Sequence, residues 1–190
     1  MKNLIVLFTL ALGIFASSHT ATAQNKYFTK DGQITFNASG NLEAIEATNK
    51  KVTSVINAET GAMEFSLLMR AFEFEKALMQ EHFNENYVES EKFPKSTFKG
   101  KIENISAVNF KKDGTYNVTV SGDLTIHGVT KPVSSKGTIT VAGTKITAKS
   151  SFEIELSNYG VKIPAVVKDN ISNKTKIDVA MQYQPLVKPQ

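Results

Sequence analysis

Side chains that could carry acid–base or metal chemistry are scarce in this sequence. Beyond residue 23 the only histidines are His82 and His127, and the chain has no cysteine. Protein zinc sites are built mainly from cysteine and histidine, and the separation of these two histidines fits no ligand spacing. A nucleophile elbow, a phosphate-binding loop and a dinucleotide fingerprint are all absent from the sequence. We therefore expect no catalytic residue, no metal site and no cofactor.

His127 is the strongest single candidate for a chemical role. It lies between Ile126 and Gly128, where an alternating segment ends and a glycine allows the backbone to bend sharply. We expect a turn histidine that bonds to local backbone, and a ligand contact is the alternative. An enzyme built on this chain would have His127 as its only evident general acid–base. The single arginine, Arg70, is expected to be a solvated strand residue, with contact to an anionic head group as the alternative.

Charge and composition argue against a nucleic-acid partner. The net charge of +4 comes from 22 Lys and Arg against 18 Asp and Glu, and it is not concentrated in a basic cluster. Phosphate recognition favours several bidentate arginines, which this chain lacks. Without cysteine there can be no disulfide, so stability must come from a core. That core draws on 41% hydrophobic residues, which include 12 Phe and no Trp.

The N-terminal residues have the pattern of a cleavable export signal. A short basic start is followed by an apolar run over residues 4–16 and by the small-residue site Ala21-Thr22-Ala23. The apolar run is too short to cross a bilayer. We expect residues 1–23 to be a signal peptide and residues 24–190 to form one domain in the periplasm, without a stable membrane anchor.

Most of the remaining chain alternates between apolar and polar residues with a period of two. Such alternation is typical of antiparallel strands with one buried face. It predicts about eight strands, within residues 33–38, 52–57, 62–72, 97–105, 115–126, 133–141, 145–156 and 174–183, and a weaker one within 45–48. All five prolines fall between or after these segments.

One segment, residues 75–83, has helical spacing instead. There Leu78 and Met79 precede His82 and Phe83 by four residues, so we expect a short helix. Many antiparallel strands with one helix predict an all-β fold. We expect a closed eight-stranded antiparallel lipocalin-like barrel, with a sandwich as the alternative, because closure removes exposed edges. A barrel of this size is either filled by its own side chains or holds a ligand.

Three blocks of sequence resemble the YceI-like family of periplasmic, lipocalin-like proteins. They are residues 82–100 (HFNENYVESEKFPKSTFKG), 122–133 (GDLTIHGVTKPV) and 152–164 (FEIELSNYGVKIP). The resemblance implies an eight-stranded barrel with a helical element around an elongated apolar pore. It also implies that some relatives hold a polyisoprenoid or fatty-acid-like chain there, and that members are generally not enzymes. The polar stretch 41–51 departs from the family pattern.

The residues and the resemblance together predict a periplasmic lipid-binding protein, a carrier or reservoir for a long isoprenoid or fatty-acyl chain. Alternatives are a lipid-modifying enzyme that uses His127, and a filled barrel that serves as a stress-related interaction protein. A homodimer also stays open. We expect ligand contacts from the wall residues Phe36, Phe65, Leu67, Phe98, Leu124, Ile126, Phe152 and Met181, and from the mouth residues Phe74, Leu78, Met79 and Phe83.

Processing of the export signal can be tested directly. Protein recovered from the periplasm should begin at Gln24, because signal peptidase cuts after an A-x-A pattern. Replacing Ala23 with leucine should block cleavage, while the same replacement at Thr22 should not. Intact-mass measurement reads the N-terminus in each case. A chain that still begins at Met1, recovered from a membrane fraction, would contradict the signal peptide.

Overall fold

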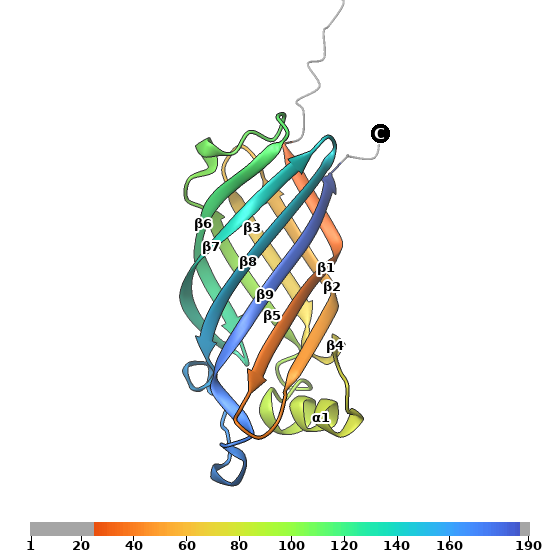
Figure 1. Ribbon diagram of the computed structural model, residues 1–190, viewed down its shortest axis with the longest axis vertical. Helices are drawn as coiled ribbons and strands as arrows, with labels where there is room; N and C mark the ends of the chain where they lie inside the picture. The colour runs from red at the N-terminus through yellow and green to blue at the C-terminus, as the bar shows by residue number, and fades with distance from the viewer. Residues whose placement is uncertain (1–24, 187–190) are drawn as a thin grey trace, which may run out of the picture.

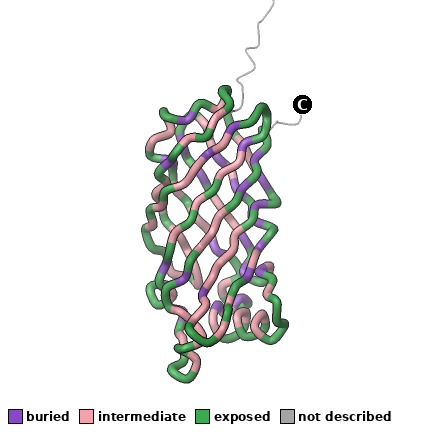
Figure 2. The backbone as a smooth tube through the Cα atoms, viewed as in Figure 1, coloured by how far each residue is buried: buried purple, intermediate pink, exposed green. Residues whose placement is uncertain are grey.

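Alternating segments become strands in the computed structural model, which describes residues 25–186. The expected signal peptide lies outside these residues. The strands are β1 (Lys26–Ser39), β2 (Glu46–Asn57), β3 (Ala62–Leu68), β4 (Phe72–Phe74), β5 (Lys95–Ile102), β6 (Gly114–Ile126), β7 (Val129–Ala142), β8 (Lys145–Glu155) and β9 (Ile171–Pro185). Buried and exposed residues alternate along them (Figure 2), as the two-residue period of a strand requires.

The strands close into a barrel (Figure 1). The antiparallel order runs β1-β9-β8-β7-β6-β5-β3-β2, and β1 pairs with β2 to complete the circle. The three-residue β4 pairs with β2 near the start of β2, and β3 pairs with β2 further along that strand. A 3₁₀ turn over Met69–Ala71 separates the two, so β3 and β4 share one position in the barrel. The predicted closed eight-stranded antiparallel barrel with one short helix is confirmed.

β2 is one strand where the sequence suggested two. Lys50 and Lys51 are both exposed, and the pairing with β1 shifts register beside them, which is the signature of a β-bulge. Asn49, just before the bulge, is fully buried. Its side-chain nitrogen donates to the Leu68 carbonyl (2.9 Å) and its side-chain oxygen accepts from the Lys51 amide (2.9 Å). The strand therefore continues through a stretch that reads as polar.

The helical segment covers one end of the barrel. α1 (Ala77–His82) continues into a π-helical turn, Phe83–Tyr87, close to the helix expected at residues 75–83. We call this end of the barrel the mouth end (Figure 1).

Side chains fill the opposite end, which we call the packed end. Ile56, Ile102 and Ile139 are at most 1% exposed there. The Tyr183 hydroxyl forms a buried hydrogen bond with the Ser54 hydroxyl (2.7 Å). The described chain also starts and finishes at this end, where the Leu186 amide donates to the Lys26 carbonyl (2.8 Å). Both ends of the described chain therefore lie away from the mouth end (Figure 1).

β7 and β8 pair along only part of their length. Their ladder runs from Ala142↔Lys145 to Gly137↔Ser150, so residues 129–136 of β7 and 151–155 of β8 are not paired with each other. We call this the β7–β8 split. Where it begins, the Ser150 hydroxyl donates to the Lys136 carbonyl (2.9 Å).

The split explains where the sequence interpretation of the prolines was wrong. Pro132 lies inside β7 rather than before it, and Pro185 is the last residue of β9. Proline cannot donate a ladder hydrogen bond, so it is tolerated in a strand where no neighbour needs that donor. The β7–β8 split provides such a place for Pro132.

The buried hydroxyl pair at the packed end generates a stability prediction. Tyr183→Phe should lower the free energy of unfolding by about 1–3 kcal/mol, because Ser54 is left buried without a partner. Denaturant unfolding measures this. Tyr116→Phe is the matched control, since that hydroxyl donates to the Lys112 carbonyl (2.8 Å) at an accessible site and should cost under about 0.5 kcal/mol. Removing both partners, in Ser54→Ala with Tyr183→Phe, should recover part of the loss. Equal effects of the two tyrosine variants would count against the buried bond.

Candidate functional site

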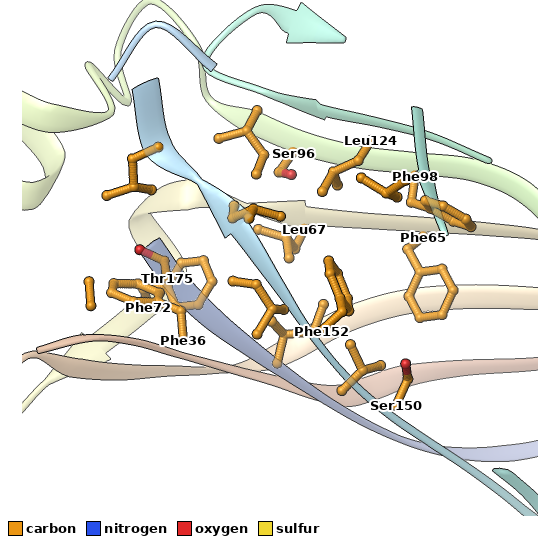
Figure 3. Close-up of a pocket in the computed structure, with 18 of the residues that line it drawn as sticks. Phe36, Phe65, Leu67, Phe72, Ser96, Phe98, Leu124, Ser150, Phe152 and Thr175 are labelled. Atoms are coloured by element: carbon orange, nitrogen blue, oxygen red, sulfur yellow. The ribbon is translucent and has the colours of Figure 1, made fainter. Parts of the chain in front are cut away.

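An apolar cavity of about 330 Å³ lies inside the barrel, between the packed end and the helical segment. Because side chains alternate along a strand, one residue in two faces this space. β6, for example, contributes Val118, Val120 and Leu124 to the lining. Side chains from several strands converge on it (Figure 3). The barrel is therefore filled at one end and hollow towards the other.

Ten of the twelve residues expected to contact a ligand line the cavity: Phe36, Phe65, Leu67, Phe74, Met79, Phe83, Phe98, Leu124, Ile126 and Phe152. Leu78 and Met181 do not. Leu78 follows the outer side of α1 and is 61% exposed, because neighbouring helical residues point about 100° apart. Met181 is 1% exposed within the packed core and is not among the lining residues. Contact between the ten residues and a ligand stays a prediction.

Four phenylalanines form a cluster at the mouth end. Phe36 from β1, Phe72 and Phe74 from β4, and Phe83 from the π-helical turn meet with ring centroids 5.0–5.7 Å apart. All four line the cavity. The cluster fixes the helical segment to the barrel wall. Sequence reasoning missed Phe72, although its spacing of two from Phe74 was a usable signal.

Several hydroxyls in the lining are hydrogen-bonded. The Ser96 hydroxyl donates to the Thr125 carbonyl (2.8 Å), and Ser135 and Ser150 hydroxyls lie 2.5 Å apart. Lys149 contributes to the lining from β8, but it is exposed and alternates with the inward residues Ala148 and Ser150. An apolar chain in this space would thus meet satisfied polar groups, which avoids a desolvation cost.

Ionisable groups gather at the opening instead. Glu43, His82 and Tyr87 all line this part of the cavity. The Glu43 carboxylate accepts hydrogen bonds from Lys76 Nζ (3.0 Å) and from Asn170 Nδ2 (3.2 Å), which lower the pKa of Glu43. Burial raises the pKa of the Tyr87 phenol, so it stays protonated near neutral pH. The opening therefore offers a polar head group an acid, an imidazole and a phenol.

His127 has a structural position outside this lining. Its Nδ1 lies 3.2 Å from the Tyr159 carbonyl oxygen and its Nε2 lies 3.0 Å from Glu89 Oε2. The ring also meets the edge of Phe93, with centroids 4.5 Å apart. Hydrogen bonds with Lys92 and then with His127 lower the pKa of Glu89.

These contacts join the β6–β7 turn to two distant loops, whereas the sequence suggested bonds to local backbone. His127 is not a lining residue, so an acid–base role on a ligand in the cavity has no geometric support. His82 reaches the opening instead. Arg70 is exposed, as expected, but it lies in the 3₁₀ turn Met69–Ala71 and not in a strand, so that part of the prediction is wrong.

Within residues 25–186, no group of three or more His, Cys, Asp or Glu side chains could hold a metal ion. The described helices are also too short and too polar to cross a membrane.

Comparisons with known proteins agree with the barrel. A family model described as "YceI-like domain" matches residues 14–183. No curated protein matches the sequence. A solved polyisoprenoid-binding domain from Saccharophagus degradans, described as implicated in plant cell wall breakdown, has a TM-score of 0.74 and 12% identity, covering 86% of this chain and 99% of that one.

Two more solved structures share the fold. BcnA from Burkholderia cenocepacia has a TM-score of 0.65 and 15% identity, over 80% of this chain and 95% of that one. The YceI protein of Campylobacter jejuni has a TM-score of 0.51 and 17% identity, over 70% of this chain and 82% of that one. At such low identity these likenesses show the fold alone.

The contacts of His127 predict a role in stability. His127→Ala should lower the free energy of unfolding by about 1–3 kcal/mol, since a side chain only 13% exposed loses two hydrogen bonds and an aromatic contact. His82→Ala is the matched control, because His82 is exposed and should change stability by under about 0.5 kcal/mol. Thermal and denaturant unfolding measure both. A His127 variant as stable as the wild type would show that these contacts do not hold the loops together.

Proposed function

We propose, from the fact that this chain belongs to the YceI-like domain family, that it binds a lipid and holds the long apolar chain of that lipid inside its barrel. The observation that carries the proposal is the cavity itself. Its wall combines aliphatic and phenylalanine side chains with the hydroxyls of Ser96, Ser135 and Ser150, which already have partners. The similar domain described as polyisoprenoid-binding supports the same class of ligand, a polyisoprenoid or fatty-acid-like chain.

The energetics of such a complex are favourable without any polar contact. Burying one CH₂ group contributes about 0.8 kcal/mol, so a chain of about ten carbons gives roughly 8 kcal/mol before the ordering cost is subtracted. The packed end offers no room or charge for a polar head group. A carboxylate or phosphate would therefore remain at the opening, near His82 and Tyr87.

The location and biological role form part of the proposal. The N-terminal pattern supports export to the periplasm, where the protein would act as a carrier or reservoir. The two alternatives have less support. A filled barrel does not account for a cavity of about 330 Å³, and His127 lies outside the lining that a lipid-modifying enzyme would need it to join.

Lipid binding predicts the effect of a charge on the cavity wall. Phe65 lies on the wall with its ring 5.9 Å from that of Phe98, so Phe65→Asp should place an unpaired carboxylate beside the bound chain. Affinity for dansyl-labelled undecanoic acid should fall by at least about tenfold, read by dansyl fluorescence. Ser66→Asp, on the next residue of β3 and outside the lining, is the matched control and should bind normally.

An uncharged variant covers the case in which Phe65→Asp fails to fold. Ala148→Leu adds bulk to the lining and should lower affinity for longer chains more than for shorter ones. Native mass spectrometry of protein purified without detergent should also show a bound isoprenoid or fatty-acyl species. Wild-type protein that is empty and binds neither the fluorescent acid nor a long-chain isoprenol would overturn the proposed function.

A further inference from the structure

Exposed apolar side chains gather around the opening of the cavity. Residues 25–186 contain four large hydrophobic residues that are strongly exposed: Leu42 (75%), Leu68 (46%), Leu78 (61%) and Val166 (91%). Leu42 lies on the loop between β1 and β2, Leu78 on α1, and Val166 on the 3₁₀ turn that precedes β9. These three segments all lie at the mouth end (Figure 1). Leu68, by contrast, belongs to the wall strand β3.

Hydrogen bonds join the three segments into one surface. The Gly40 amide donates to the Asn170 carbonyl (2.9 Å) and the Asn41 amide donates to the Asp169 carbonyl (2.8 Å). Glu43 then connects this pair of loops to α1, because one carboxylate oxygen accepts from Asn170 and the other from Lys76. We call residues 40–45, 76–83 and 164–170 the mouth rim. Its apolar side chains are therefore held in fixed relative positions.

Each segment of the mouth rim has one apolar side chain that lines the cavity and another that is exposed to solvent. Met79 lines the cavity while its neighbour Leu78 is exposed, and Val167 lines the cavity while Val166 is exposed. On the β1–β2 loop, Ile45 lines the cavity and Leu42 is exposed. Apolar surface thus continues from the cavity wall, across the rim, to the outside of the molecule. The charged groups of the rim lie beside this path, and the carboxylate of Glu43 is paired with Lys76 and Asn170.

We propose that the mouth rim docks on a lipid bilayer, with Leu42, Leu78 and Val166 inserted among the lipids and the cavity opening facing them. This inference rests on the proposed function, and it names the surface through which the barrel exchanges its lipid with a membrane. Long-chain lipids reside in membranes because their apolar chains are costly to expose to water. A barrel that exchanges them needs its opening in contact with that source.

The chemistry of the rim favours a bilayer over a protein partner. Stable protein interfaces cover about 800 Å² per partner around aromatic or arginine anchors. The rim instead presents single aliphatic side chains on three separate segments, which suits a fluid surface that needs no shape complementarity. Its charges nearly cancel, with Lys76 and Lys168 against Glu43, Glu81 and Asp169. Docking is therefore apolar, and salt should weaken it little.

Vesicle flotation tests the docking. Wild-type protein should float with phosphatidylcholine vesicles, with or without phosphatidylglycerol, at both low and high salt. The triple variant L42S/L78S/V166S should lose at least about tenfold in partitioning, because three inserted aliphatic side chains are removed. Leu68→Ser is the matched control, since it changes an exposed leucine outside the rim. A purification tag can follow residue 190, because the described chain finishes at the packed end, where the Leu186 amide donates to the Lys26 carbonyl.

A second measurement separates this inference from lipid binding in the cavity. The triple variant should still bind dansyl-labelled undecanoic acid delivered from solution, because no cavity residue has changed. Vesicle docking without binding of that acid by the wild type would support the rim and count against the proposed function. Wild-type protein that does not float, or a Leu68→Ser variant that loses as much partitioning as the triple variant, would overturn the inference. The inference would also be overturned if the wild type does not bind vesicles but self-associates, and the triple variant does not self-associate. The rim would then be an interface between two copies of the chain.

Discussion

Pairing of β1 with β2 is the constraint on which the rest of the structure depends. These strands are joined by one loop, and the ladder between them turns a curved sheet into a closed circle. Closure gives most backbone donors and acceptors of the wall strands partners, with the β7–β8 split as an exception. It also forces one face of every strand inward. The enclosed volume must then be filled by side chains or lined by apolar ones. In this barrel it is filled at the packed end, and it is hollow with an apolar lining towards the mouth end.

The two-residue period gave most of the fold from sequence because it depends only on backbone geometry. It could not reveal the β-bulge at Lys50 and Lys51, since a shift in phase looks the same as the end of a strand. Nor could it show that β7 continues through Pro132. Whether a proline is tolerated depends on which neighbouring strand is present, and that is a property of the assembled sheet.

The candidate site was predictable to a similar degree and for the same reason. The two-residue alternation correctly selected inward residues such as Phe65 and Leu124. It carries no information on how deep in the barrel a residue lies, so Met181 was grouped with residues nearer the mouth end. The bonds of His127 to Glu89 and Tyr159 span more than thirty residues and leave no local signal. The same holds for Glu43, whose two partners come from different loops.

The β7–β8 split gives the two ends of the barrel different mechanical character. Towards the packed end, an unbroken ladder from Gly137↔Ser150 to Ala142↔Lys145 joins β7 to β8, and separating these strands would break backbone hydrogen bonds. Towards the mouth end no ladder joins β7 to β8 beyond the hydroxyl contacts of Ser135 and Ser150, so these strands can separate without breaking a ladder. The wall is therefore compliant near the mouth and stiff at depth. Such a barrel accommodates ligands of different width near its opening, while its filled end limits how long an enclosed chain can be.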